Sequence, residues 1–204
     1  MSFSATPTYA ELKTAVANWL HRADLTNYVD DLILMGEKYV FRHARTRDME
    51  TSLSVVMSSG AAAIPTDFVE LKHARIDGSP TTSLQPKSAD WIMLRYPLRS
   101  AESKPKFIGV DGSNFIFGPY PDSDYTVKGT YYKRLSAVSV SANALFLANP
   151  DLYLFAALAE AAPFLKGDAR VPLWEGKRDR ILSDVNGEDQ NARYSGGPLS
   201  MVAA

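Results

Sequence analysis

The sequence contains no cysteine, carries almost no net charge and has no long apolar run. Without cysteine the chain has no disulfide framework, thiolate zinc site, iron–sulfur cluster or cysteine nucleophile. Its 22 lysines and arginines nearly balance 23 aspartates and glutamates, so no net basic field attracts nucleic acid from a distance. No stretch approaches the roughly 18 apolar residues that a membrane span needs. We therefore expect neither a membrane segment nor a signal peptide.

The composition is that of a globular protein. Hydrophobic residues make up 46% of the 204 residues, and 12 glycines and 12 prolines are close to average usage. A chain of this length can bury a sizeable core without disulfides or metals, as one domain or two small ones.

Two helices are predicted near the start of the chain. Thr8 and Glu11 have the spacing of a capping box, in which the two side chains bind exposed amides at a helix start. The first helix should therefore begin at Tyr9 and end near Arg22. Apolar residues then recur every three or four positions, which predicts a second, longer helix up to about Arg45.

The pattern changes to a period of two from Met49, which indicates strands. Turn signals divide residues 49–135 into five or six strands, expected to pair antiparallel. Asp111-Gly112 marks one hairpin. Ser88 can cap a single short helix inside this region, and Pro97 should end it.

Helices return near the end of the chain. Pro150 suits the first helical position, and the dense apolar run that follows must be buried. Pro163 should kink this helix, because its ring removes an amide and clashes with the preceding turn. Another helix should open near Pro172 and stop at Asn186-Gly187.

Together these predictions describe an α+β protein. The expected fold is a helical bundle made of N- and C-terminal helix pairs, residues 1–48 and 149–190, with an antiparallel β unit, residues 49–148, inserted between them. Residues 191–204 contain Gly-Gly-Pro and few apolar side chains, which predicts a flexible, extended C-terminal arm.

The sequence offers no pattern for catalysis, metal binding or a cofactor. The three histidines are far apart, and Glu70 and His73 form a lone Glu-x-x-His spacing where a two-metal site needs two. No glycine-rich phosphate loop or nucleophile elbow is present. Four aromatic strand residues are interpreted as sheet core in preference to base-stacking positions, namely Phe115, Phe117, Tyr131 and Tyr132.

One local basic cluster stands out at the end of the second helix. It contains Arg42, Arg45 and Arg47. These cations can complement the negative end of the helix dipole, an effect of about 0.3–1 kcal/mol. They can also contact DNA phosphates or a neighbouring subunit, and both readings stay open.

Several stretches resemble the head-to-tail adaptor proteins of tailed bacteriophages, also called connector or tail tubular A-like proteins. The stretches, in order, are residues 9–13, 41–50, 64–71, 129–135 and 149–165. The likeness rests on their order and spacing along residues 8–194, since none of them is a catalytic motif.

The resemblance implies a structural protein and not an enzyme. In that family about twelve copies form a ring beneath the portal protein, join the capsid to tail and nozzle proteins, and let DNA pass during ejection. Synthesis in the host cytoplasm and a place in the virion follow from it. The C-terminal extension docks on the portal, which here would involve Arg193, Tyr194, Leu199 and Met201.

Two other functions compete with this one. A sequence-tolerant nucleic-acid-binding protein would use Arg42, Arg45 and Arg47, and its affinity would fall steeply with salt. A hydrolase would need a pocket with converging titratable groups, which a sequence cannot display.

Overall fold

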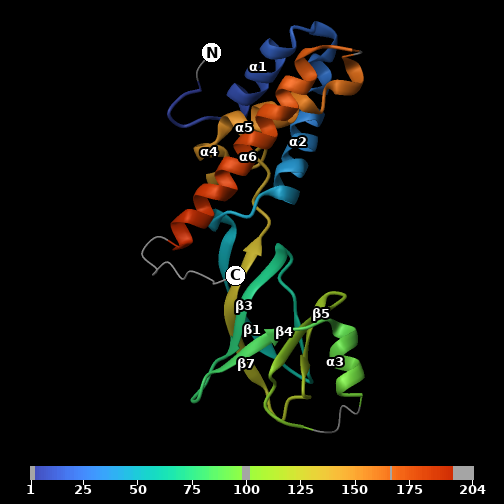
Figure 1. Cartoon of the computed structure of the whole chain (residues 1–204), viewed down its shortest axis with the longest axis vertical. Helices are drawn as coiled ribbons and strands as arrows, with labels where there is room; N and C mark the ends of the chain where they lie inside the picture. The colour runs from blue at the N-terminus through green and yellow to red at the C-terminus, as the bar shows by residue number, and fades with distance from the viewer. Residues whose placement is uncertain (1–2, 98–101, 166, 195–204) are drawn as a thin grey trace, which may run out of the picture. The chain divides into compact units, whose positions relative to one another are not determined.

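The computed structural model describes residues 3–97, 102–165 and 167–194. The chain divides into two compact units. Met1–Asp48 and Leu135–Ala204 form a helical unit, and Met49–Arg134 form a β unit. Figure 1 shows the first unit built from the blue and the orange to red ends of the chain, with the strands supplied by its middle.

The helical unit is formed by segments that are far apart in the sequence. It contains α1 (Tyr9–Leu20), the 3-10 helix η1 (Ala23–Tyr28), α2 (Val29–His43), α4 (Ala144–Ala148), α5 (Pro150–Ala159), the 3-10 helix η3 (Ala162–Phe164) and α6 (Arg170–Tyr194). A further short 3-10 helix, η2 (Arg47–Met49), leads out of it.

Helix α1 begins where the capping box predicted. The Thr8 side chain accepts a hydrogen bond from the Glu11 amide, and the Glu11 carboxylate accepts one from the Thr8 amide at 2.8 Å. Two amides that the helix itself leaves unpaired are thus satisfied. The Thr8 amide also holds the pKa of the Glu11 carboxyl below its usual range.

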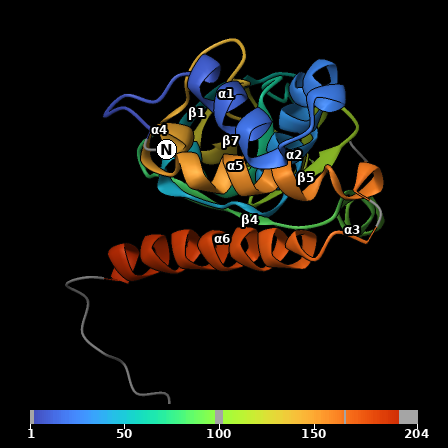
Figure 2. The same cartoon turned by 90° about the horizontal axis from the view of Figure 1, so that it is seen from above.

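Helix α5 forms the centre of the helical unit. All eight residues from Leu152 to Ala159 are buried. Helices α1, α2 and α6 pack against it, and Figure 2 shows α5 between α6 and the pair α1 and α2. A helix surrounded in this way needs apolar residues on every side, which explains the continuous apolar run in the sequence.

The end of α5 differs from the prediction. Pro163 does not kink the helix, because α5 already ends at Ala159 and Pro163 lies in the first turn of η3. Proline is tolerated there since the first amides of a helix have no partner within it. Gly167 then adopts a left-handed backbone conformation, with φ of 69°, in the turn that leads into α6.

Over its described residues, the β unit contains seven strands and one helix. They are β1 (Glu50–Met57), β2 (Ala61–Ala63), β3 (Phe68–Ile76), β4 (Thr82–Pro86), α3 (Ala89–Arg95), β5 (Phe107–Asp111), β6 (Asn114–Gly118) and β7 (Tyr125–Lys133). The strand order is β1-β7-β3-β4-β5-β6-β2.

The sheet is mixed and nearly closed. Strands β4 and β5 pair in parallel, with Gln85 opposite Phe107, and the other pairs are antiparallel. The two outermost strands, β1 and β2, follow each other in sequence and meet at a bridge between Ser58 and Ala61. The sheet thereby curls into a barrel-like form, with a core that includes Phe115 and Phe117.

The predicted fold class is therefore wrong. The protein is α+β, but it is not a helical bundle with a small antiparallel insert. Strand β4 was not recognised because it is short, ends in Pro86 and buries only Leu84. Without β4, α3 looked like an isolated helix, whereas it connects the parallel strands β4 and β5. Parallel neighbours need such a crossover connection.

Candidate functional site

The basic cluster lies at the end of α2, in the helical unit. Arg42 is exposed in the last turn, Arg45 follows the helix and Arg47 begins η2. The Arg45 Nη1 atom donates to the carbonyl oxygens of Ala44 at 2.7 Å and Phe41 at 3.3 Å. Since the last carbonyls of a helix lack partners within it, this geometry supports the interpretation of Arg45 as a cation that caps α2.

Asn186 of α6 binds the same turn of the chain. Its Oδ1 accepts a hydrogen bond from the Arg45 amide at 3.0 Å, and its Nδ2 donates to the His43 carbonyl oxygen at 3.1 Å. The predicted stop at Asn186-Gly187 is wrong, because α6 continues to Tyr194. The Asn186 side chain is used to hold α2 and does not terminate its own helix.

A second contact joins α6 to α2, one turn earlier in α2 and about two turns earlier in α6. The Arg178 guanidinium lies 3.7 Å from the centroid of the Tyr39 ring, a cation–π contact. The Tyr39 hydroxyl donates to Asp179 at 3.0 Å, and Arg178 Nε donates to the same carboxylate at 2.8 Å. The bond from Arg178 lowers the pKa of the Asp179 carboxyl. These contacts fix the rotation of α6 about its axis.

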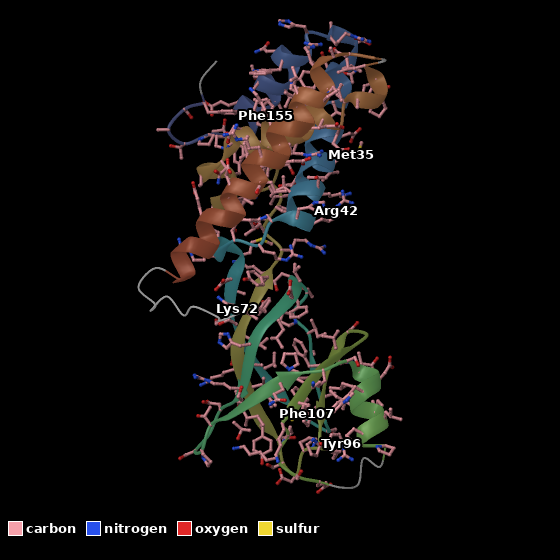
Figure 3. The ribbon with its side chains drawn as sticks, in the orientation of Figure 1. Met35, Arg42, Lys72, Tyr96, Phe107 and Phe155 are labelled. Atoms are coloured by element: carbon pink, nitrogen blue, oxygen red, sulfur yellow. The ribbon has the colours of Figure 1, made fainter. Side chains whose placement is uncertain are left out.

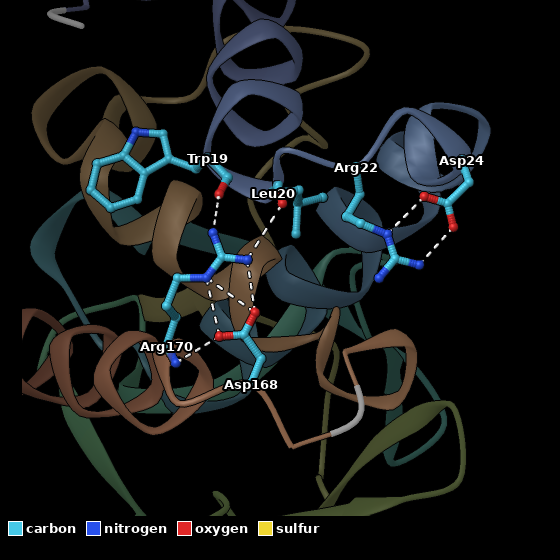
Figure 4. Close-up of polar contacts among 6 residues, drawn as sticks. All are labelled: Trp19, Leu20, Arg22, Asp24, Asp168 and Arg170. Carbon is cyan, nitrogen blue, oxygen red and sulfur yellow. Dashed lines mark hydrogen bonds and ion pairs between the residues drawn. The ribbon is translucent and has the colours of Figure 1, made fainter.

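The start of α6 is tied to the end of α1. Figure 4 shows the Arg170 guanidinium between Asp168 and the last carbonyls of α1. It donates to the Trp19 carbonyl oxygen at 3.1 Å and to Asp168 at 2.7 Å. Arg22 and Asp24 form a similar pair nearby at 2.7 Å. Helix α6 is thus held to α1 by Arg170 at its start and to α2 by Asn186 further along.

The structure places only part of the predicted docking arm. Arg193 and Tyr194 are the last two residues of α6. Leu199 and Met201 lie outside the described residues. The role of these four residues in docking stays a prediction.

The four aromatic strand residues are buried. Phe115 and Phe117 have no exposed surface, and Tyr131 and Tyr132 are 6% and 7% exposed. The Tyr131 hydroxyl donates to Asp67 at 2.8 Å, and burial together with this carboxylate raises the pKa of Tyr131 to about 12. The interpretation as sheet core is confirmed for Phe115, Phe117 and Tyr131, whereas Tyr132 is buried on the other face of β7.

Among the described residues, no three histidine, cysteine, aspartate or glutamate side chains gather as a metal site. No helix in the same ranges has the length and apolar character required to cross a membrane.

The sequence analysis missed one buried carboxyl group. Glu37 lies on the face of α2 that packs inward, is 4% exposed, and accepts a hydrogen bond from the Val138 amide at 2.8 Å. Burial raises the pKa of the Glu37 carboxyl, and the Val138 amide partly opposes this effect. Its spacing from Ile33 and Val40, both buried, is the signal that would have revealed it.

Substitutions of Glu37 should distinguish the effect of its charge on stability from the effect of its hydrogen bond to Val138. Glu37→Gln keeps an acceptor for Val138 and removes the ionisable group. Between the usual pKa of glutamate and the raised pKa of Glu37, the folded state keeps a proton that the unfolded state has released. The free energy of unfolding of the wild type should therefore fall, relative to that of Glu37→Gln, as the pH rises above the usual pKa of glutamate. Denaturant unfolding at about pH 4 and about pH 8 measures the difference.

Glu37→Leu is the matched control. It leaves the buried Val138 amide without an acceptor, which should cost about 1–3 kcal/mol at both pH values. Equal pH profiles for wild type and Glu37→Gln would contradict the raised pKa. Tyr9, Asp30 and Asp31 line the same groove as Glu37 and are unchanged in both variants.

An apolar groove lies between α1 and α5 in the helical unit. Its walls include Thr14 and Trp19 of α1 and Leu154 and Phe155 of α5, and it encloses about 470 Å³. The Trp19 and Phe155 rings meet edge to face at 5.5 Å. Because Trp19 remains 39% exposed, the groove offers apolar surface that another chain can cover.

A protein-family model described as SU10 adaptor protein matches residues 7–202. The match therefore includes both the helical unit and the β unit. It confirms the resemblance to phage head-to-tail adaptors that the sequence motifs indicated. No curated protein matches the chain.

Proposed function

Because this chain belongs to the SU10 adaptor protein family, we propose that it is the structural head-to-tail adaptor of a tailed bacteriophage. About twelve copies form a ring beneath the portal, join the capsid to tail and nozzle proteins, and surround the path of the DNA. The protein is made in the host cytoplasm and becomes part of the virion. The observation that carries this proposal is a family match that spans nearly the whole chain.

The charge balance supports a conduit for DNA. Each phosphate that a protein neutralises adds affinity, so a strongly basic lumen would retain the genome it has to release. The chain carries a formal charge of −1. Mixed charges also let copies of one chain pack side by side without strong mutual repulsion.

Residues 191–204 are proposed to dock on the portal. Arg193 and Tyr194 end α6, a helix that Asn186 and Arg170 hold to the rest of the helical unit. A peptide that follows such an anchored helix starts from a defined point, which lowers the cost of positioning it on a partner. Leu199 and Met201 would supply the apolar contacts.

The replacement of both Leu199 and Met201 by alanine should weaken portal docking more than tenfold. Each buried apolar side chain contributes about 1.5–3 kcal/mol, so the loss of two exceeds one order of magnitude. Co-sedimentation of the full chain with purified portal rings measures the effect. Ser195→Ala with Ser200→Ala, in the same segment, is the control and should dock like wild type.

Two outcomes contradict different parts of the proposal. If the double alanine variant docks as well as wild type, the assignment of the docking residues is wrong. If the wild-type chain binds neither portal rings nor tail components, the adaptor function itself is wrong.

The nucleic-acid alternative rests on the arginine cluster. The Arg45 guanidinium donates hydrogen bonds to carbonyl oxygens at the end of α2, which favours helix capping over phosphate contact for this residue. Binding to DNA through the remaining cluster would appear at low salt and fall steeply as salt rises.

A further inference from the structure

The helical unit has an exposed ridge along α2 in addition to its groove. The ridge consists of Asp31, Leu34, Met35, Lys38 and Arg42, all of them exposed. Positions spaced by three, four and seven residues lie on one face of a helix. Leu34 is 43% and Met35 45% exposed, so the middle of the ridge is apolar and its ends are charged.

Met35, Lys38 and Arg42 of the ridge are exposed, while Asp31 and Leu34 also line the groove that contains Tyr9 and Glu37. The opposite face of α2, with Leu32, Gly36 and Val40, is buried. At Gly36 the α2 backbone comes close to the α5 backbone. Figure 3 shows Met35 and Arg42 along the outer edge of α2. The ridge and the α1–α5 groove are therefore different surfaces, and one copy cannot bring its own ridge into its own groove.

The charges of the two surfaces are complementary. Glu11 and Asp151 line one end of the groove, and the Lys177 ammonium lies 4.9 Å from the Phe155 ring centroid toward the other end. The ridge has the same order along α2 as the groove has along α1, with Asp31 near the N-terminal end and Lys38 and Arg42 toward the C-terminal end. An α2 helix laid antiparallel to α1 places each ridge charge near a groove charge of opposite sign.

The two surfaces also agree in length. Asp31 and Arg42 are separated by about 16 Å along a helix, at 1.5 Å per residue. The α1 side of the groove, from Ala10 to Trp19, extends for about 14 Å by the same rise. Leu34 and Met35 would then meet the apolar middle of the groove.

We propose that the α2 ridge of one copy packs into the α1–α5 groove of the next copy, as the contact between successive subunits. This inference rests on the proposed adaptor function, which requires a ring. Because the two surfaces differ, the contact is head-to-tail and leaves a free ridge and a free groove at the ends of any open chain. Such a contact builds rings when the rotation between copies closes.

Cysteine cross-linking tests the contact directly, because the natural chain has no cysteine. The full chain with Thr14→Cys and Met35→Cys carries one thiol in the middle of the groove and one in the middle of the ridge. A disulfide forms only when the two Cα atoms come within about 7 Å. Oxidation of the portal-bound protein should give dimers and higher multiples that disappear on reduction.

A matched variant separates this contact from chance collisions. Ser183→Cys with Met35→Cys moves the partner thiol to an exposed position of α6 that does not line the groove. It should give at least tenfold less cross-linked product. The same yield from both pairs, no product from the first pair, or efficient dimers from Met35→Cys alone would overturn the proposed contact.

The same experiment distinguishes failure of the contact from failure of the function. Suppose that the wild-type protein binds portal rings, but the variant with Thr14→Cys and Met35→Cys gives no cross-linked product on them. The proposed contact is then wrong, and the adaptor function is not contradicted. Where wild type does not bind portal rings, the adaptor function fails, and oxidation of the concentrated free protein decides the contact.

Discussion

Replacement of Gly36 by valine should lower the stability of the helical unit by about 3 kcal/mol. A Cβ atom at position 36 would lie 2.6 Å from the Ala157 nitrogen and 2.7 Å from the Ala156 carbonyl carbon, both in the backbone of α5. Backbone atoms of a packed helix cannot turn aside as a side chain can. The helices must separate, which exposes apolar surface along the centre of the unit.

Gly176→Ala is the matched control for Gly36→Val. Gly176 is also a helical glycine, but a Cβ built on it meets nothing within 4 Å. Alanine there should stabilise α6 by about 0.5–1 kcal/mol, since glycine loses more backbone freedom on folding. Denaturant unfolding followed by far-ultraviolet circular dichroism compares the two variants. Equal stability of Gly36→Val and wild type would mean that α2 and α5 do not cross at Gly36.

The corresponding site in the β unit is Gly129, and Gly129→Val should destabilise that unit by about 3 kcal/mol. Gly129 lies in β7, which pairs with β1 on one side and β3 on the other. A Cβ atom there would clash with the His73 carbonyl oxygen, beside the irregular register between Leu71 and His73. Strand β3 would have to move away from β7, and the ladder between them would lose hydrogen bonds.

Lys128→Ala, one residue earlier in β7, is the control for Gly129→Val. It removes an exposed ion pair with Asp77 and should cost less than about 1 kcal/mol. Hydrogen exchange locates the effect, because amides with few remaining contacts lose protection first. Gly129→Val should lower protection in β7 and β3, with α5 unchanged. An equal loss of hydrogen-exchange protection in α5 would show that the helical unit and the β unit do not unfold independently.

Local sequence signals predicted the elements whose ends depend on neighbouring residues. Thr8 and Glu11 start α1, and Ser88 caps α3 through a hydrogen bond from the Trp91 amide. Asp111-Gly112 joins β5 and β6, with φ of 56° at Gly112. Capping boxes and tight turns act over three or four residues, so a short stretch of sequence contains all the information they need.

Elements whose state depends on distant partners were predicted poorly. Strand β4 has few features of its own and exists because β3 and β5 pair with both its edges. Helix α6 passes through Asn186-Gly187 because Asn186 binds the end of α2, 143 residues away in sequence from His43. Local propensity is a weak prior when such tertiary contacts compete with it.

For the candidate functional surfaces too, the sequence predicted some features and only the fold showed the others. The arginine cluster was visible in the sequence, yet only the fold showed that Arg45 binds carbonyl oxygens of α2. The apolar residues of α1 and α5 were predicted to be buried, and the groove between the two helices depends on how closely they pack. Sequence spacing identifies the face of a helix, but not the space between two helices.

The order of motifs along residues 8–194 was enough to indicate the family. Local signals were enough to predict the α+β class and the starts of α1, α3 and α5, because caps and periodic patterns involve residues that are close in sequence. Tertiary structure alone decided the parallel pairing of β4 and β5, the near closure of the sheet, the burial of Glu37 and the positions of ridge and groove. These features arise from contacts between residues far apart in the chain, and their energies depend on distances that composition and periodicity do not contain.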